Sequence, residues 1–210
     1  DRFRAIWIES TNPAQSIADS KQFRKAMRAL ELSVVVDVAM SETARLADYV
    51  LPASSQFEKH ECSFFSHEFP HNTFHLRQPL MDPLPGTIAE SEIYVRMIRQ
   101  LGVVDDALLS SLRSAAKRGR VQFALAFFAA AGADPKLERL TPYLLYETLG
   151  TTLADSEKAV AALWAVAHLC SMSYPAATAR AGFTGPGFES GERLFDAMLK
   201  ARRIVFTQDD

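Results

Sequence analysis

Short apolar segments alternate with polar or amphipathic segments in the first half of the chain. Three segments have the length and the β-branched content of strands: FRAIWIE at 3–9, SVVVD at 33–37 and DYVLP at 48–52. Between them, KQFRKAMRALEL at 21–32 has apolar residues at helical spacing, and SETARLAD at 41–48 predicts a short helix. The order strand, helix, strand, helix, strand predicts an α/β fold with a parallel sheet.

Polar loops follow the first two predicted strands, at 9–19 and 37–42. In the first loop, Asn12-Pro13 is a turn signal, because proline disfavours helical backbone in the residue before it. Ligands of parallel sheets bind beside the carboxyl ends of the strands. We therefore expect a ligand site, if the fold has one, to be formed by these loops.

Beyond the third strand, the sequence predicts an irregular segment at 60–87, rich in His, Phe and Pro. AESEIYVRMIRQLG at 89–102 then predicts a helix that carries Ile93, Met97 and Leu101 on one apolar stripe and ends at its glycine.

The second half of the chain is dominated by predicted helices. The segments are ALLSSLRSAAKR, VQFALAFFAAAG, TPYLLYETLG, SEKAVAALWAVAHLC and SGERLFDAMLKA. We expect them to form an α-helical portion without catalytic groups, at 103–202, appended to the sheet part at 1–102. The strand-like IVFT that follows is expected to return to the parallel sheet through 203–206. It lies in a terminal segment at 203–210, and both this segment and the start of the chain resemble cuts within a longer polypeptide.

Composition and charge exclude several functional classes. The 210 residues include 23 Lys plus Arg and 25 Asp plus Glu, so the chain lacks the basic footprint of nucleic-acid or membrane-surface binding. Two distant cysteines, Cys62 and Cys170, exclude a disulfide scaffold and a four-thiolate metal site within the chain, and agree with a cytoplasmic setting. No signal peptide or membrane-spanning apolar run is visible.

Asn12 and Asp37 stand at the ends of neighbouring strands, where an amide and a carboxylate suit a nucleotide. A carboxylate can accept two hydrogen bonds, from a guanine edge or from two ribose hydroxyls. The pattern also allows a second interpretation, in which both residues only stabilise the backbone of their own turns.

Two further groups are ambiguous from the sequence. Lys59 can reach a phosphate or a base, or it can form a solvated surface pair with Glu58. The side chains of His60, Cys62, His67, His71 and His75 have spacings compatible with zinc, but the repeated compact motif of a zinc site is missing. We therefore expect packed or solvated histidines there and assign no metal ligand.

Motifs of phosphate loops, of dinucleotide-binding glycine turns and of hydrolase nucleophiles are absent from the sequence. We therefore predict no catalytic residue in this chain.

The combined motifs resemble the molybdopterin oxidoreductases of the dimethyl-sulfoxide-reductase and formate-dehydrogenase type. The resemblance covers residues 4–102 and rests on motifs in the same order and at matching spacing. They are Asn12-Pro13, Asp37, Ser41-Glu42-Thr43-Ala44, Ala47-Asp48-Tyr49-Val50-Leu51-Pro52 and Glu58-Lys59. The resemblance implies a Rossmann-like domain that holds the guanosine end of a molybdopterin guanine dinucleotide.

Carried over by position, five residues are implied to bind this cofactor. Asn12 would lie against the dinucleotide, Val36 and Asp37 would contact guanosine, Lys59 would approach the nucleotide, and Glu92 would complete the pocket. The resemblance further implies a parent enzyme with molybdenum or tungsten. It also allows an iron–sulfur cluster in the parent enzyme, but not in this chain. The expected partners are the remaining domains of the parent and an electron-transfer subunit, and the chain alone is expected to be inactive.

This sequence departs from the family after Lys59, where HECSFFSHEFPHNTFH replaces a stretch that resembles Gly-Thr-x-x-Asn-x-Glu-Gly-Arg. The departure favours a rival interpretation, a non-catalytic interaction or scaffold domain that has lost its ligand. A further rival is a domain that binds another nucleotide, because a fold does not fix its ligand.

Overall fold

A computed structural model describes residues 2–63, 71–200 and 203–207. The chain packs into two units. The first contains Asp1–Lys59 and Leu80–Ile93, and the second contains His60–Pro79 and Tyr94–Asp210. The predicted division into parts at 1–102, 103–202 and 203–210 stays a prediction.

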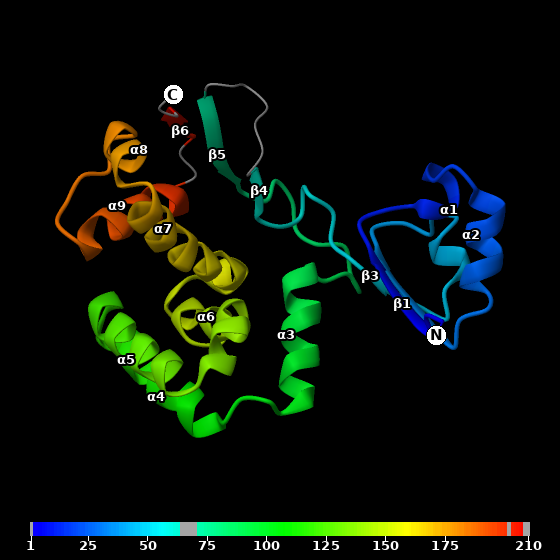
Figure 1. The fold of residues 1–210 in the computed structure, drawn as a ribbon, viewed down its shortest axis with the longest axis horizontal. Coiled ribbons are helices and arrows are strands. Elements are labelled where there is room, and N and C mark those ends of the chain that lie inside the picture. The colour runs from blue at the N-terminus through cyan, green and yellow to red at the C-terminus, as the bar shows by residue number, and fades with distance from the viewer. Residues whose placement is uncertain (1, 64–70, 201–202, 208–210) are drawn as a thin grey trace. The chain divides into compact units, whose positions relative to one another are not determined.

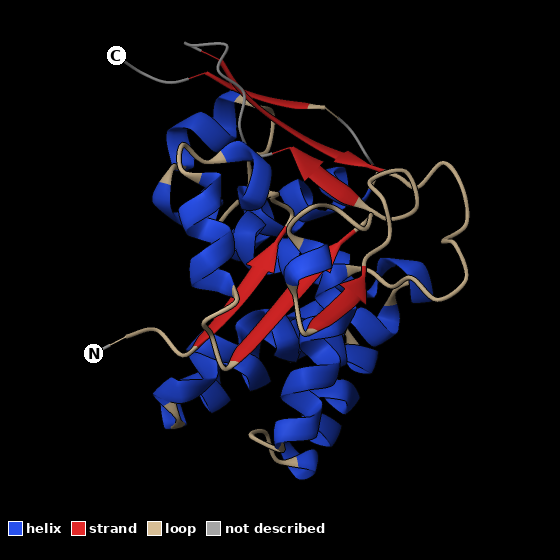
Figure 2. Ribbon diagram, turned by 90° about the vertical axis from the view of Figure 1, so that its right-hand side faces the viewer, coloured by secondary structure: helices blue, strands red, loops and turns tan. Residues whose placement is uncertain are grey.

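The first unit contains a three-stranded parallel sheet in the order β1-β2-β3 (Figures 1 and 2). Its strands are β1 Ala5–Glu9, β2 Leu32–Asp37 and β3 Tyr49–Pro52. The predicted α/β fold with a parallel sheet is confirmed. Strands β1 and β3 lie within their predicted segments, and β2 begins one residue before its predicted segment, at Leu32.

The helices that connect these strands are shorter than the predicted segments 21–32 and 41–48. The loop after β1 contains a one-turn helix, α1 Pro13–Ser16, and helix α2 covers Ser20–Met27. Asp19 caps α2, because its Oδ1 accepts a hydrogen bond from the Gln22 amide at 2.9 Å. The predicted helix at 41–48 reduces to a 3₁₀ turn, η1 Ala44–Leu46.

Both faces of the parallel sheet are covered, as the uninterrupted apolar strand β2 requires. On one face, Ile8 and Val35 pack with Met27 of α2 and with Ala44. On the other face, Val36 packs with Ala53 and Ile93. Successive residues of a strand point to opposite faces, so neighbouring Val35 and Val36 belong to different cores.

Helix α3, Glu90–Leu101, begins in the first unit and continues into the second. The predicted stripe of Ile93, Met97 and Leu101 is wrong, because Met97 is 41% and Leu101 70% exposed. Val95 is buried instead, in the core of the second unit.

The second unit is mainly helical, as predicted, and α7 packs along α9 (Figure 1). Its core centres on Phe123, Trp164 and Phe195, whose side chains are almost fully buried. Among the described residues, no helix is long and apolar enough to cross a membrane. The helices and 3₁₀ segments are α4 Asp106–Arg118, α5 Arg120–Ala133, η2 Pro135–Leu140, α6 Thr141–Glu147, η3 Leu149–Thr152, η4 Asp155–Ala161, α7 Ala162–Ser173, α8 Pro175–Arg180 and α9 Phe188–Leu199.

The second unit also has its own antiparallel sheet, in the order β4-β5-β6. It consists of β4 Glu61–Ser63, β5 His71–Arg77 and β6 Ile204–Thr207. The prediction of an irregular 60–87 is therefore wrong for these strands. The predicted return of 203–206 to the parallel sheet is also wrong, because Ile204 pairs with Phe74 of β5, where both side chains enter the helical core.

Candidate functional site

The carboxyl ends of the three parallel strands lie at one edge of the first unit's sheet. Glu9 is in register with Val36, and Asp37 is in register with Pro52. The chain turns sharply after β1, since Ser10 has a φ of 54°, in the left-handed region that residues other than glycine rarely adopt. The Ser10 amide donates to the Val36 carbonyl at 3.3 Å, which fixes this turn at the edge.

Asn12 connects the loop after β1 to the turn after β2. Its Nδ2 donates to Oε2 of Glu42 at 2.7 Å and to Oε1 of Gln15 at 3.1 Å. Its Oδ1 accepts from the Thr43 hydroxyl at 2.7 Å and from the Thr43 amide at 3.2 Å. The side chain therefore bridges segments some thirty residues apart, which is more than the local turn role that the sequence also allowed.

Asp37 holds the same turn from the other side. One carboxylate oxygen accepts from the Ser41 hydroxyl at 2.7 Å, and the other accepts from the Ala39 amide at 3.3 Å. The Ser41 hydroxyl in turn accepts from the Ala44 amide at 3.2 Å. Asn12 and Asp37 are thus both hydrogen-bonded to the turn 41–44, in agreement with the expectation that they lie at one edge of the sheet.

Thr43 and Glu42 are structural members of this edge that the sequence prediction did not assign. Thr43 is fully buried, and its hydroxyl oxygen accepts from the Ala14 amide at 3.0 Å while it donates to Asn12. The Ser41-Glu42-Thr43-Ala44 motif was the signal that could have identified both, since its hydroxyl, carboxyl, hydroxyl order is that of a side chain–backbone turn.

Glu42 places an exposed carboxylate at the edge. The hydrogen bond from Asn12 is the main cause that lowers the pKa of Glu42, and its own backbone amide, Arg24 and Arg45 lower it further. The carboxylate is therefore ionised at neutral pH. With Asp37, it gives this edge two hydrogen-bond acceptors that ligand N–H or O–H groups can reach.

The Val36 side chain cannot contact a ligand at the edge, because it is only 2% exposed and packs with Ala53 and Ile93. Its role is confined to the backbone, where its carbonyl accepts from Ser10. The expected contact of Val36 with guanosine therefore reduces to a backbone contribution, and it stays a prediction.

Glu58 and Lys59 do not form the solvated pair that the sequence allowed. Glu58 is buried, and its carboxylate accepts from the Ser55 amide at 2.6 Å and from the Leu84 amide at 3.0 Å. The bond from Ser55 is the main cause that lowers the pKa of Glu58. Lys59 instead forms an ion pair with Glu90, and both side chains are largely buried.

Residues 86–88 bring the start of α3 to the carboxyl end of β3. Ala53 and Ile88 form a parallel bridge, and the Ile88 amide donates to the Pro52 carbonyl at 3.2 Å. Helix α3 begins two residues later with Glu90, so the half-buried Glu92 lies in its first turn. The five predicted residues therefore fall into two groups, with Asn12, Val36 and Asp37 at β1 and β2, and Lys59 and Glu92 beyond β3.

The histidine segment gives no metal centre within the described residues. There, no three His, Cys, Asp or Glu side chains are grouped so that they could hold a metal ion. The His60 ring bonds to the Ser156 carbonyl at 3.2 Å, and Cys62 packs against the core of the second unit. His67 lies outside the described residues.

Comparison with known protein families decides what kind of domain this edge belongs to. The molybdopterin oxidoreductase family matches residues 1–98, which contain the whole parallel sheet and all five predicted site residues. The match to this family thus covers just under half of the 210 residues. The resemblance seen in the Asn-Pro, strand-end Asp and Glu-Lys motifs is confirmed.

Curated relatives agree with this assignment. The chain is 30% identical over 109 residues to the probable oxidoreductase YoaE of Bacillus subtilis, and 27% identical over 100 residues to a trimethylamine-N-oxide reductase of Vibrio cholerae. It is 44% identical over 54 residues to the alpha subunit of an F420-dependent formate dehydrogenase of Methanocaldococcus jannaschii.

These alignments cover 51%, 48% and 26% of this chain, but only 16%, 12% and 8% of the respective relatives. The chain thus shares a short region with much longer oxidoreductases.

Proposed function

We propose that the first unit binds the guanosine end of a molybdopterin guanine dinucleotide at the carboxyl edge of its parallel sheet. The observation that carries the proposal is that Asn12 and Asp37 are both tied to the turn 41–44 at this edge. Ligands of open α/β sheets bind at this side of the strands. The match of residues 1–98 to the molybdopterin oxidoreductase family supplies the class of cofactor.

The hydrogen-bonding capacity of the edge fits a guanosine. An ionised carboxylate has about four acceptor positions, and Asp37 uses two of them within the protein. The remaining positions can accept from the ring N–H and amino group of guanine or from two ribose hydroxyls. Glu42, exposed and ionised, can accept hydrogen bonds from the two ribose hydroxyls.

Asn12 then acts as a positioning residue rather than as a contact. Its amide nitrogen has two protein acceptors and its oxygen has two protein donors. It holds Glu42 and Thr43 in place, and so keeps the turn beside Asp37 in one conformation. Val36 fixes the start of the first loop through its carbonyl.

Lys59 and Glu92 form the far side of the proposed site. The ion pair with Glu90 holds the Lys59 ammonium at the beginning of α3, where it is 15% exposed. We propose that this ammonium faces the phosphates of the dinucleotide and that Glu92 closes the rim of the pocket. A lysine held in one position by a carboxylate loses little side-chain entropy when a phosphate binds.

The bound pterin, with molybdenum or tungsten, would supply two-electron redox chemistry in the parent enzyme. This chain would contribute binding and placement and would be inactive alone. The proposed partners are further domains of the parent and an electron-transfer subunit. The alternatives are a scaffold domain without a ligand and a domain that binds a different nucleotide.

Calorimetric titration of the 210-residue chain with GDP and with ADP tests the proposal. We expect GDP to bind and to bind more tightly than ADP. Asp37→Asn should weaken GDP binding by at least ten-fold, since a hydrogen bond to a charged group contributes about 1.5–3 kcal/mol. Glu31→Gln is the matched control, because it removes one negative charge beside β2 at the opposite, amino end of the sheet.

The alternatives give different results in the same titration. A scaffold domain would bind neither nucleotide, and a domain for another nucleotide would prefer ADP. An equal loss of affinity in Asp37→Asn and Glu31→Gln would show a general charge effect and would contradict the proposed role of Asp37.

A further inference from the structure

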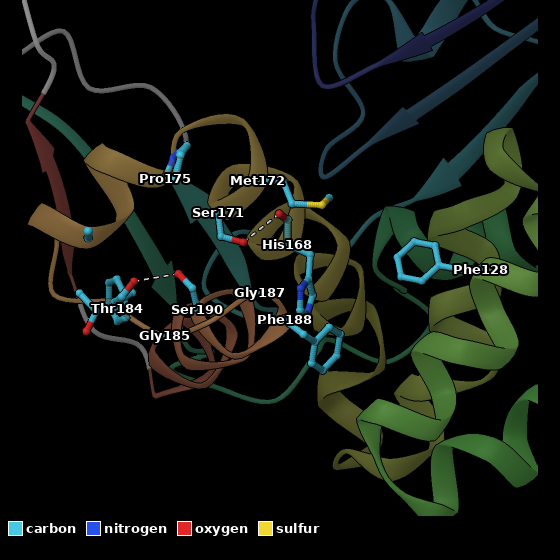
Figure 3. Close-up of a pocket in the computed structure, with 12 residues that line it drawn as sticks. Phe128, His168, Ser171, Met172, Pro175, Thr184, Gly185, Gly187, Phe188 and Ser190 are labelled. Atoms are coloured by element: carbon cyan, nitrogen blue, oxygen red, sulfur yellow. Dashed lines mark hydrogen bonds between the residues drawn. The ribbon is translucent and has the colours of Figure 1, made fainter.

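The second unit contains a cavity of about 670 Å³ that is formed by this unit alone. Its walls come from α5, α7, α8, α9 and the loop between α8 and α9, and Phe128 stands apart from the stacked His168 and Phe188 (Figure 3). The volume falls within the range of about 300–1,000 Å³ that is usual for small-molecule sites.

One wall of the cavity is a rigid stack of rings. The His168 and Phe188 rings stack with centroids 4.3 Å apart. The centroid of the Trp164 ring lies 4.6 Å from that of His168. Glu192 of α9 fixes the stack, because one of its oxygens bonds the Trp164 Nε1 at 2.6 Å and the His168 Nε2 at 2.9 Å. The wall is therefore preformed and does not need a ligand to order it.

The charges of this region are neutralised behind the wall. Burial disfavours the ionised form of Glu192, but hydrogen bonds from His168 and Trp164, together with Arg120, lower its pKa below the ordinary value. Arg120 pairs with Glu192 at 2.8 Å and with Asp196 at 2.6 Å. These ionised groups satisfy one another, and none of the three lines the cavity.

The cavity surface combines aromatic rings with hydroxyl groups that can form hydrogen bonds. Among the described residues that line it, there is no Asp, Glu, Lys or Arg. Ser171 donates to the His168 carbonyl at 2.9 Å and Ser190 donates to the Phe183 carbonyl at 2.8 Å, so both hydroxyl oxygens keep lone pairs for a ligand donor. Thr184 adds a third hydroxyl.

We propose that this cavity is a binding site for a neutral, ring-containing small molecule that carries a hydrogen-bond donor. The rings provide an apolar surface on which a planar ligand can stack. The lining contains no Asp, Glu, Lys or Arg that could pair with a charged ligand, so a charged group would lose its hydration there with little compensation. The site is independent of the nucleotide edge proposed for the first unit.

Two fluorescent probes with one ring system test the charge preference. N-phenyl-1-naphthylamine is neutral and carries an N–H donor, and 8-anilinonaphthalene-1-sulfonate adds one sulfonate to the same rings. We expect saturable fluorescence enhancement of the neutral probe with the 210-residue chain at one probe per chain. The sulfonate should bind at least ten-fold more weakly.

Variants locate the bound probe. Ala179 is an exposed alanine of α8 that lines the cavity, so Ala179→Phe should fill it and weaken binding of the neutral probe at least ten-fold. Ala176→Phe is the matched control, because Ala176 is exposed on the same helix and does not line the cavity. Phe128→Ala, at a side chain that is 54% exposed, should weaken binding about three-fold or more through lost apolar contact.

The proposal is overturned if the neutral probe shows no saturable binding, or if the sulfonate binds as tightly. It is also overturned if Ala179→Phe and Ala176→Phe affect binding equally. In that case the probe would lie on exposed apolar side chains such as Leu125 and Leu169, which are 70% and 62% exposed. Circular dichroism of each variant confirms that the helices are retained.

Discussion

The Asn12 amide oxygen accepts a hydrogen bond from the Thr43 hydroxyl at 2.7 Å, across 31 positions of sequence. The same hydroxyl oxygen accepts from the Ala14 amide at 3.0 Å. The loop after β1 and the turn after β2 are thus joined through one buried hydroxyl. If the proposed function is correct, the shape of the nucleotide edge depends on this junction.

Thr43→Val should destabilise the edge without a change of volume. The valine leaves the buried Ala14 amide without its acceptor, which costs about 1–3 kcal/mol. Native-state hydrogen exchange of β1 and β2 amides measures this loss. Ser16→Ala serves as the control, because its exposed hydroxyl donates to Asn12 in the same loop and its removal should change the free energy by less than about 0.5 kcal/mol. Equal effects of both variants would contradict the structural role of Thr43.

The first unit should lose stability in acid. Hydrogen bonds from Ser55 lower the pKa of Glu58 and those from Ser33 lower the pKa of Asp48, relative to ordinary values of 4.5 and 3.8. A carboxyl group with a lowered pKa in the folded state stabilises the fold above its unfolded pKa, and this contribution disappears as the pH falls through the folded pKa. We therefore expect stability to be constant near neutral pH and to fall as the pH drops below about 4.5.

Glu58→Gln separates this effect from general acid unfolding. The amide can accept only part of the bonds from Ser55 and Leu84, so the variant should be less stable at pH 7 and should show a smaller loss between pH 5 and 3 by thermal denaturation. A variant with the wild-type pH dependence would show that Glu58 does not contribute to it.

Gly191 allows α7 and α9 to pack closely in the second unit. A Cβ atom at this position would lie 2.3 Å from Nδ1 of His168, a separation at which something must move. Gly191→Ala should therefore destabilise the unit by about 1–3 kcal/mol in urea denaturation followed by circular dichroism. Gly132→Ala, in helix α5 with open space around the new methyl group, should instead stabilise by roughly 0.5–1 kcal/mol. A destabilised Gly132→Ala together with a neutral Gly191→Ala would refute this packing.

Cys62 should be an unreactive thiol. Burial, with the nearby Glu61, raises its pKa from 9.0 to about 11. Since the thiolate is the reactive form, iodoacetamide at pH 8 should modify Cys62 about a hundred-fold more slowly than the same cysteine in urea-unfolded chain. Mass spectrometry of the Cys62 peptide measures both rates, and similar rates would contradict the partial burial of the Cys62 thiol.

The sequence predicted the parallel sheet because its central strand, β2, is covered on both faces and is therefore mainly apolar, as in SVVVD. It did not predict β4 and β5, since five of the seven β5 side chains are polar and only Phe74 and Leu76 enter the core. Pairing of β5 with β6 joins residues about 130 positions apart, which no local pattern indicates.

The site residues show the same division. Asn12 and Asp37 were predicted because strand ends and family motifs mark them, and the structure links both to one turn. The partners of the predicted residues were not foreseen. Lys59 was considered with its sequence neighbour Glu58, but its carboxylate partner Glu90 is brought to it by the bridge between Ala53 and Ile88. No sequence motif predicts the cavity beside His168, because it is formed by helices whose apolar residues are typical of any core.

The most direct test of the nucleotide proposal is to locate GDP on the chain by amide NMR shifts in the ¹⁵N-labelled 210-residue protein. We predict that saturating GDP shifts the amides of Ser10, Asn12 and residues 38–44, with weaker shifts at Lys59 and Glu92, and leaves α4–α9 unchanged. Glu31→Gln should keep this pattern and Asp37→Asn should lose it. Shifts confined to the second unit, or no shifts at millimolar GDP, would contradict the assignment of a guanosine site to the carboxyl edge.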